Sequence, residues 1–280
     1  MTKLKVACIQ NNASASHDEN IACAMKLVSE AATRGAELVC LPEYYSGFGA
    51  RDGRLDLPVF AEAEHQGLAA ARKQARRLGC WLLVGSIAVL KADGRIANRS
   101  YVLDRGGEIV ASYDKIHLFD VDLGPGKVYR ESEVVAPGSR AVVADTPWGG
   151  LGMSVCYDLR FAALYRALAM AGAAMLTVPA AFTKLTGAAH WHVLNRARAI
   201  ENGAFVIAPC QYGTFPGGGE AFGHSLIVDP WGRVLADGGE GEGMAFAEID
   251  LGEVAAARGR IPSLTHTRPF TLGGIAKAAE

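Results

Sequence analysis

The first part of the chain alternates between two hydrophobic patterns, and this alternation constrains the fold more than any other feature. Residues 4–10 and 37–41 are short apolar runs that are typical of buried strands. Between them, apolar residues recur at helical spacing over 21–32, and Asp18 or Asn20 is placed to cap that helix. A strand, a helix and a second strand in so short a stretch predict a βαβ unit, and therefore a sheet with parallel neighbours.

The same alternation returns further along the chain, with antiparallel strands added in the middle. Asp93-Gly94 and Arg105-Gly106-Gly107 separate strand-like runs and are hairpin signals. We expect further helices at 62–78, 161–171 and 188–202 and further strands at 81–89, 96–103, 108–113, 151–155, 174–178, 204–209, 222–228, 234–236 and 244–249. Helices outside such sheets indicate the α/β class and a four-layer α-β-β-α sandwich, although composition alone does not separate this arrangement from an open doubly wound sheet.

Nothing in the sequence divides the chain. It contains no short repeat, low-complexity block or linker, so we expect one domain over residues 1–280. The segment 114–138 has little periodicity, and a loop of that length in a compact domain is usually functional or disordered. After Ile261 the sequence has no strong period, so 262–280 is predicted to be a loose C-terminal arm or a contact to another subunit.

Composition argues against several classes of function. With a net charge of −1 and no run of Lys or Arg, the chain offers no evident surface for nucleic acid. No apolar stretch reaches the length of a membrane span, and the first residues lead into a strand without a signal-peptide pattern. The six cysteines include no C-x-x-C pair, which argues against a zinc ribbon or a redox pair. We therefore expect a cytoplasmic protein with reduced thiols and no membrane or nucleic-acid partner.

Cys156 follows a strand-like run and precedes a helical pattern. A cysteine at the carboxyl end of a buried strand is held rigidly near backbone N–H groups that can stabilise a thiolate or an oxyanion. Strand-to-helix turns present the nucleophile in other hydrolases. The alternative is a cysteine that acts only as a small core hydrophobe, which is common.

Two further polar groups lie at the margins of apolar runs. Glu43 follows the run 38–42, and Lys115 lies between aromatic and apolar residues in 113–119. Taken singly, the alternatives are a solvated carboxylate and a lysine that extends along the surface. Together with Cys156 they suit acyl transfer through a thioester, because a thiol needs a base and the oxyanion needs a cation.

These three segments, taken in order, resemble the signature blocks of the nitrilase (carbon–nitrogen hydrolase) superfamily. The blocks are Leu41-Pro42-Glu43, Tyr113-Asp114-Lys115-Ile116-His117-Leu118-Phe119 and Cys156-Tyr157-Asp158-Leu159-Arg160-Phe161. Two later stretches, 189–202 and 223–232, are similar to further blocks, so the resemblance covers nearly the whole chain. Within the superfamily the sequence is most similar to the Nit branch, amidases acting on ω-amides of α-keto acids and on deaminated glutathione.

The resemblance implies a role for each matching residue. Cys156 would be the nucleophile, Glu43 the general base, Lys115 the oxyanion partner, and the backbone N–H of Tyr157 a second oxyanion donor. Glu131 would orient Lys115 and the substrate amide, the alternative being an exposed loop carboxylate. The resemblance also implies the α-β-β-α sandwich, no metal, no organic cofactor, and homodimers or larger homo-oligomers.

Arg160 and Thr186 match positions that bind the substrate carboxylate in the Nit branch. A guanidinium suits bidentate capture of a carboxylate. The alternatives are an ion pair between Arg160 and Asp158 or another nearby acid, and a turn hydroxyl for Thr186.

Three histidines invite comparison with metal ligands. His190 and His192 are two residues apart on the predicted helix and point to different faces, which is poor geometry for one ion. We interpret both of them, and His224, as structural.

The sequence also departs from the family pattern. Ala162-Ala163 stand where the family usually has Pro-Glu, and Ala188 replaces a proline that is common in the branch. The loop 43–57 matches no single subgroup cleanly. Since substrate-facing loops set specificity, the exact amide stays open.

We therefore predict a cysteine hydrolase that cleaves the C–N bond of a small carboxylate-bearing amide and releases ammonia or an amine. The same three groups would also serve a nitrilase or an N-carbamoyl amino acid hydrolase. The alternative of another class is a non-enzymatic cysteine sensor or interaction module, although a sensor would need only the reactive thiol.

Overall fold

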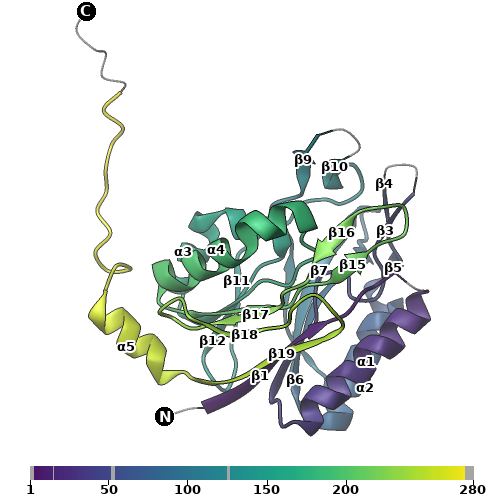
Figure 1. Ribbon diagram of the computed structural model, residues 1–280, viewed down its shortest axis with the longest axis horizontal. Coiled ribbons are helices and arrows are strands. Elements are labelled where there is room, and N and C mark those ends of the chain that lie inside the picture. Colours follow the sequence, from purple (N-terminus) through teal and green to yellow (C-terminus); the bar gives the residue numbers. More distant parts are fainter. Residues whose placement is uncertain (1–2, 15, 52–53, 125–126, 275–280) are drawn as a thin grey trace, which may run out of the picture.

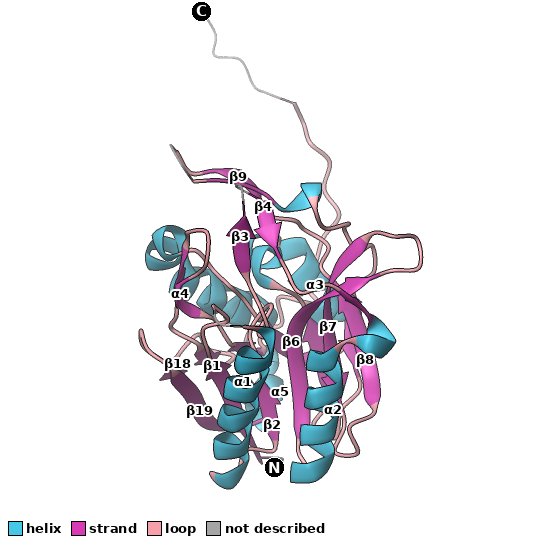
Figure 2. Cartoon of the chain, turned by 90° about the vertical axis from the view of Figure 1, so that its right-hand side faces the viewer, coloured by secondary structure: helices cyan, strands magenta, loops and turns pink. Residues whose placement is uncertain are grey.

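Two facing sheets form the centre of the protein, and a pair of helices covers each of them (Figures 1 and 2). The computed structural model describes residues 3–14, 16–51, 54–124 and 127–274. In spatial order, the first sheet contains β19 (Gly243–Asp250), β1 (Lys3–Gln10), β2 (Leu38–Cys40), β6 (Trp81–Leu90), β7 (Ile96–Leu103) and β8 (Ile109–Asp114), with β5 (Phe60–Ala61) beside β6. The second contains β11 (Val142–Ala144), β12 (Gly150–Met153), β13 (Ala173–Thr177), β14 (Phe205–Ala208), β17 (Leu226–Val228) and β18 (Val234–Asp237).

Both sheets combine a parallel centre with antiparallel edges, as predicted. Strands β1, β2 and β6 run parallel to one another, and so do β12, β13 and β14. The antiparallel neighbours are β19, β7 and β8 in the first sheet and β11, β17 and β18 in the second.

The helices occupy the two outer layers. Helices α1 (His17–Thr33) and α2 (Gln66–Leu78) pack on the first sheet, and α3 (Ala162–Met170) and α4 (Lys184–Asn202) pack on the second (Figure 1). Helix α5 (Gly252–Arg260), which the sequence analysis did not anticipate, follows β19.

Strand β1 shows why the sheets stack in layers. Successive residues of a strand point to opposite faces. Leu4, Val6 and Cys8 belong to the core shared with the second sheet, whereas Ala7 and Ile9 belong to the core beneath the α1 and α2 helices. Since both faces of the sheet are apolar, each needs a covering layer, and the predicted four-layer α-β-β-α sandwich is confirmed.

The expected cap of the first helix was wrong. Helix α1 is capped by Ser16, not by Asp18 or Asn20. The Ser16 side chain accepts a hydrogen bond from the backbone N–H of Glu19, and the Glu19 carboxylate accepts one from the Ser16 N–H. This reciprocal capping box satisfies two amide groups at once, which a lone aspartate or asparagine would not do.

Two boundaries in the second half also differ from expectation. Helix α4 begins at Lys184 rather than at 188, so Thr186 lies in its first turn. The strand expected over 222–228 is divided into β16 (Glu220–Phe222), which pairs with β15 (Tyr212–Thr214), and β17. The division follows from the left-handed backbone between them, where φ is 75° at Gly223 and 52° at His224.

The segment 114–138 is ordered over its described residues. It contains β9 (Asp120–Asp122) paired with β10 (Val128–Arg130) and then a 3₁₀ turn at Glu131–Glu133. Pro125 and Gly126 lie outside the described residues. A second small ribbon, β3 (Gly49–Arg51) and β4 (Arg54–Asp56), lies close by in space (Figures 1 and 2).

Helix 62–78 was expected to be continuous, but its first residues form a separate 3₁₀ turn, Glu62–Glu64.

The C-terminal segment leaves the body of the protein after α5. Residues 263–265 form a turn that stays against the body, where Arg166 donates to the Ser263 and Leu264 carbonyls. Beyond Thr267 the chain runs outward as an extended arm (Figure 1), and Phe270 and Leu272 on it are 90% and 93% exposed. The last residues of the predicted arm, 275–280, lie outside the described part of the chain. Within that described part, no helix has the length and apolar character that crossing a membrane requires.

Candidate active site

Cys156 stands at the point where a buried strand becomes a tight turn. Strand β12 leads to Val155, and Cys156 begins a 3₁₀ turn, Cys156–Arg160, that separates the strand from α3. The Cys156 backbone takes a left-handed conformation with φ of 48° and donates its N–H to the Pro179 carbonyl at 2.9 Å. A non-glycine residue held in this region is strained, and such strain persists where the surrounding structure fixes it. The expected strand-to-helix turn at Cys156 is therefore present, with an intervening 3₁₀ turn before helix α3.

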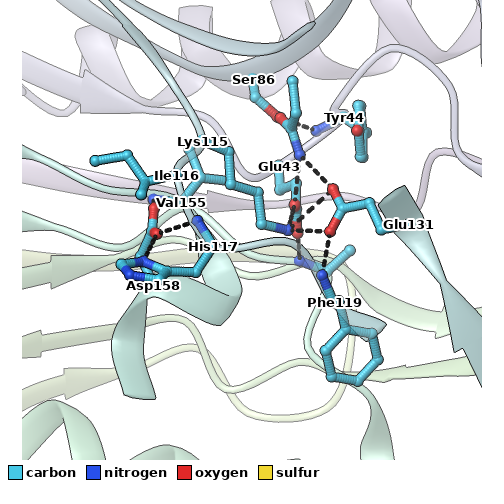
Figure 3. A network of polar contacts seen from close by, with 12 residues as sticks. Glu43, Tyr44, Ser86, Lys115, Ile116, His117, Phe119, Glu131, Val155 and Asp158 are labelled. Carbon is cyan, nitrogen blue, oxygen red and sulfur yellow. Dashed lines mark hydrogen bonds and ion pairs between the residues drawn. The ribbon is translucent and has the colours of Figure 1, made fainter. Parts of the chain in front are cut away.

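Asp158 ties this turn to the segment that carries Lys115. Its wholly buried carboxylate accepts hydrogen bonds from the Val155 N–H at 2.9 Å and the Tyr113 hydroxyl at 2.7 Å. It also contacts His117, through the backbone N–H at 3.0 Å and through Nδ1 at 2.7 Å (Figure 3). Tyr113 and His117 flank Lys115, so one aspartate fixes the lysine segment against the cysteine turn. The sequence alone does not show this role, because the three bonds to Tyr113 and His117 exist only after the two segments meet.

Lys115 lies between two carboxylates in a buried cluster (Figure 3). Its Nζ is 2.9 Å from Glu43 Oε1 and 3.1 and 2.8 Å from the two oxygens of Glu131. The side-chain amide of Asn98 donates to both acids, at 2.9 Å to Glu43 and 3.2 Å to Glu131. The side chains of Glu43, Lys115 and Glu131 are 4%, 2% and 6% exposed, so neither acid is the solvated loop carboxylate that was the alternative.

Backbone groups hold the remaining carboxylate oxygens. The Ala181 N–H donates to Glu43 Oε2 at 2.9 Å, and the Phe119 N–H donates to Glu131 Oε2 at 2.7 Å. Buried charges are tolerated when they are paired and fully hydrogen-bonded. The cluster meets that condition, and its geometry is fixed without any bound ligand.

The charges of this cluster act on the thiol in opposite directions. Burial raises the pKa of Cys156 well above its usual value, the Glu43 carboxylate raises it further, and Lys115 lowers it. Burial by itself would lower the pKa of Lys115, but the Glu131 and Glu43 carboxylates raise it well above the usual value. At neutral pH the site therefore holds a cationic lysine and a neutral thiol, and the thiol lies beside the Glu43 side chain.

A cavity of about 200 Å³ opens onto these groups. Cys156, Glu43, Lys115 and Glu131 all contribute to its lining, so the four predicted catalytic residues meet at one place. Seven aromatic side chains from segments far apart in sequence contribute to its lining: Tyr44, Phe48, Phe119, Tyr129, Tyr157, Phe182 and Phe215. Such an apolar wall with a few fixed polar groups is typical of a small-molecule site.

The three predicted binding residues are placed differently from one another. Tyr157 and Thr186 line the cavity. Arg160 stands at its side, with its guanidinium carbon 5.8 Å from the Tyr157 ring centre and 5.4 Å from that of Phe182. Arg160 Nη1 also lies 3.3 Å from Nδ1 of His190. The alternative of an Arg160–Asp158 ion pair was wrong, because Asp158 is turned to the lysine segment.

Comparison with known proteins places these features in a family. Residues 5–259 match the sequence profile of the carbon-nitrogen hydrolases. The chain is 40% identical over 265 residues to a protein of Synechocystis named deaminated glutathione amidase, covering 93% of this chain and 96% of that one. It is 36% identical over 271 residues to the human omega-amidase NIT2, covering 96% of both.

Solved structures that superpose on this chain indicate the same family as the sequence matches do. The NitFhit protein of C. elegans superposes with a TM-score of 0.86 at 35% identity, over 95% of this chain and 65% of that longer one. Nit3 of Saccharomyces cerevisiae, a member of branch 10 of the nitrilase superfamily, superposes with a TM-score of 0.82 at 29% identity, over 93% and 94% of the two chains. The predicted resemblance to the nitrilase superfamily and its Nit branch is confirmed, and the chain belongs to the carbon–nitrogen hydrolase family, enzymes that hydrolyse carbon–nitrogen bonds.

Proposed function

We propose that this enzyme hydrolyses a small carboxylate-bearing amide through a thioester on Cys156. The proposed substrate is an ω-amide of an α-keto acid or deaminated glutathione. Two of its relatives are named deaminated glutathione amidase and omega-amidase, which supports this class. The observation that carries the proposal is the Lys115 ammonium held between Glu43 and Glu131 in the cavity that Cys156 also lines.

In the first half of the reaction, Glu43 accepts the thiol proton as the Cys156 sulfur bonds to the amide carbon. The carbonyl oxygen becomes an oxyanion, which Lys115 and the backbone N–H of Tyr157 stabilise. The C–N bond then breaks, and the leaving ammonia or amine takes the proton from Glu43.

In the second half, a water molecule gives a proton to Glu43 and attacks the thioester. The C–S bond breaks, the free acid leaves, and the proton returns from Glu43 to the sulfur. Glu131 keeps Lys115 in place throughout, since its two oxygens lie 3.1 and 2.8 Å from Nζ.

The substrate carboxylate is assigned to Arg160 and Thr186. Arg160 packs against two rings of the cavity wall, and Thr186 lines the cavity from the first turn of α4. A guanidinium can bind both oxygens of a carboxylate, so a substrate bound here would present its amide to the thiol in one orientation.

A release assay tests the reaction and its substrate class. Wild type and Cys156→Ala would be incubated with an α-keto ω-amide, deaminated glutathione, a nitrile and an N-carbamoyl amino acid, and released ammonia or amine measured. We expect turnover of the carboxylate-bearing amides by wild type and none by the variant. Turnover by Cys156→Ala would exclude the thioester route, and a preference for the nitrile or the carbamoyl compound would replace the amide assignment.

The role of Arg160 has its own test. Replacing Arg160 by Lys keeps the charge but loses the two-pronged geometry, so KM for the carboxylate-bearing amide should rise by about tenfold or more, the value of a charged hydrogen bond. A neutral amide of similar length serves as the matched control, and its kcat/KM should be unaffected. An equal loss on both amides would assign Arg160 to the structure of the cavity instead.

We also propose that the enzyme forms a homodimer or larger homo-oligomer. Large apolar side chains on the outer faces of α3 and α4 are more than half exposed: Met170, Leu185, Val193 and Ile200. The arm adds Phe270 and Leu272. Surfaces of this kind on a soluble enzyme are typical of subunit contacts. Light scattering of wild type and Val193→Asp tests the proposal: the variant should dissociate, and a wild-type monomer at micromolar concentration would contradict it.

The proposed compartment is the cytoplasm. All six cysteines are free, and Cys156 must stay reduced to react. Fractionation of the producing cells, followed by thiol counting without added reductant, would check this assignment.

A further inference from the structure

A second group of ligating side chains lies outside the active site and takes no part in the proposed reaction. His192 comes from α4, His224 from the segment between β16 and β17, and Asp237 from the end of β18. One donor atom of each lies within 4.8 Å of the other two. We propose that these three residues bind a divalent transition-metal ion, and that Zn²⁺ is the preferred ion.

The distances suit a common ion. His192 Nε2 is 3.0 Å from Asp237 Oδ2, and His224 Nδ1 is 2.9 Å from Oδ1 and 3.2 Å from Oδ2. Ligands placed 2.0–2.1 Å from a zinc ion in tetrahedral geometry lie roughly 3.3 Å from one another. Small movements of the side chains would therefore admit the ion. Two imidazoles and one carboxylate are a donor set that zinc and its first-row neighbours accept, with a fourth position left for water.

The backbone around His224 is fixed before any ion binds. Its N–H donates to the Gly239 carbonyl at 2.7 Å, and its own carbonyl accepts from Trp191 Nε1 at 2.7 Å. The ring stacks on Phe222 with 4.5 Å between centres. The Gly239 N–H donates to Asp237 Oδ1 at 2.9 Å, which orients the carboxylate as outer partners do in metal sites.

The site is open enough for an ion to enter. The His192, His224 and Asp237 side chains are 35%, 21% and 35% exposed. The competing explanation is that His192 and His224 only donate hydrogen bonds to the Asp237 carboxylate. That arrangement requires a proton on His192 Nε2 and on His224 Nδ1. An ion would displace those protons, so metal affinity separates the two explanations.

Metal titration of the purified full-length enzyme tests the proposal. Cys156→Ala is the parent, because it removes the active-site thiol as a competing ligand. After treatment with a chelator and its removal, the parent is titrated with ZnCl₂ by calorimetry and with CoCl₂ by visible absorption. We expect one ion per chain, with Co²⁺ bands typical of a low-coordinate nitrogen and oxygen site.

Three variants of that parent complete the experiment. His192→Gln and Asp237→Asn should each weaken binding by at least about tenfold, as loss of a ligand or its orienting partner does. His190→Gln is the matched control, since it lies on the same helix but contacts Arg160 rather than Asp237. If His192→Gln does not fold by circular dichroism, Asp237→Asn, which keeps the side-chain shape, decides. No stoichiometric binding by the parent, or equal affinity in parent and ligand variants, would overturn the proposal.

Discussion

Cys156 and Cys8 are both buried thiols, but Cys8 lies inside a strand and Cys156 beyond the end of one, and only Cys156 has a carboxylate and an ammonium beside it. Burial raises the pKa of both above the usual value. Cys8 lies inside β1, where its sulfur is 3.6 Å from the Leu226 carbonyl oxygen and belongs to the core between the two sheets. Cys156 lies beyond the end of β12, beside the Glu43 carboxylate and the Lys115 ammonium.

Burial alone favours the neutral thiol and so makes a cysteine a poor nucleophile. Desolvation favours the neutral thiol at both positions. What differs is the place in the fold, because the end of a strand is where loops from other segments can bring a base and a cation. The proposed reactivity of Cys156 therefore depends on its neighbours, and changing these residues one at a time tests the comparison.

The largest expected effect is the loss of kcat/KM when the Cys156 sulfur is replaced by oxygen. The same replacement at Cys8 is the comparison. Cys156→Ser should lower kcat/KM by ~10⁴ to 10⁶, the range seen when an activated nucleophile is lost. Cys8→Ser should leave kcat/KM of the folded enzyme near wild type, since its hydroxyl can still donate to the Leu226 carbonyl. Steady-state kinetics on a turned-over amide measures both. A similar loss at both positions would remove the distinction.

The second-largest expected effect follows from removing the Lys115 cation. Lys115→Met should lower kcat by ~10² to 10³, the value of one oxyanion-stabilising group. It should also cost about 3–5 kcal/mol of unfolding free energy, because two buried carboxylates lose their partner. Urea unfolding and kinetics measure the two losses.

Lys3→Met is the matched control for that stability change. Lys3 makes an equally short ion pair, 2.7 Å to Glu248, but both side chains are largely exposed to solvent. Its removal should leave the unfolding midpoint unchanged, because water already solvates both charges. Equal destabilisation by the two variants would show that burial does not separate these pairs.

The smallest effect concerns the pH dependence of stability. A thiol whose pKa is raised by folding stays protonated in the native state, while the unfolded state loses the proton near pH 9. The unfolded state then binds fewer protons, so stability should fall as pH rises above about 9, by up to about 1.4 kcal/mol per pH unit for each such thiol. Cys8→Ala should show a smaller fall than wild type between pH 8 and pH 10 in urea unfolding. An identical slope would mean that Cys8 loses its proton as easily in the folded state.

The sequence predicts the fold class and the candidate catalytic residues because both leave local marks. Apolar periodicity depends on residues near one another in the chain, and it placed β7 at its observed bounds, Ile96–Leu103. The motifs around Glu43, Lys115 and Cys156 were recognisable for the same reason. Local signals failed at the start of α1, where Asp18 or Asn20 was expected as the cap and Ser16 is the cap.

Only the tertiary structure decided which groups hold those residues in place. The roles of Asn98 and Asp158 carry no local mark. Asn98 binds carboxylates 33 and 55 residues away, and Asp158 binds His117 and Tyr113, 41 and 45 residues away. His192 and Asp237 are likewise 45 residues apart, so the helix alone suggested that the histidine had no ligand partner. Local propensity fixes which residues form an element, but hydrogen bonds between elements depend on where the sheets and loops meet, and that is settled by packing over the whole chain.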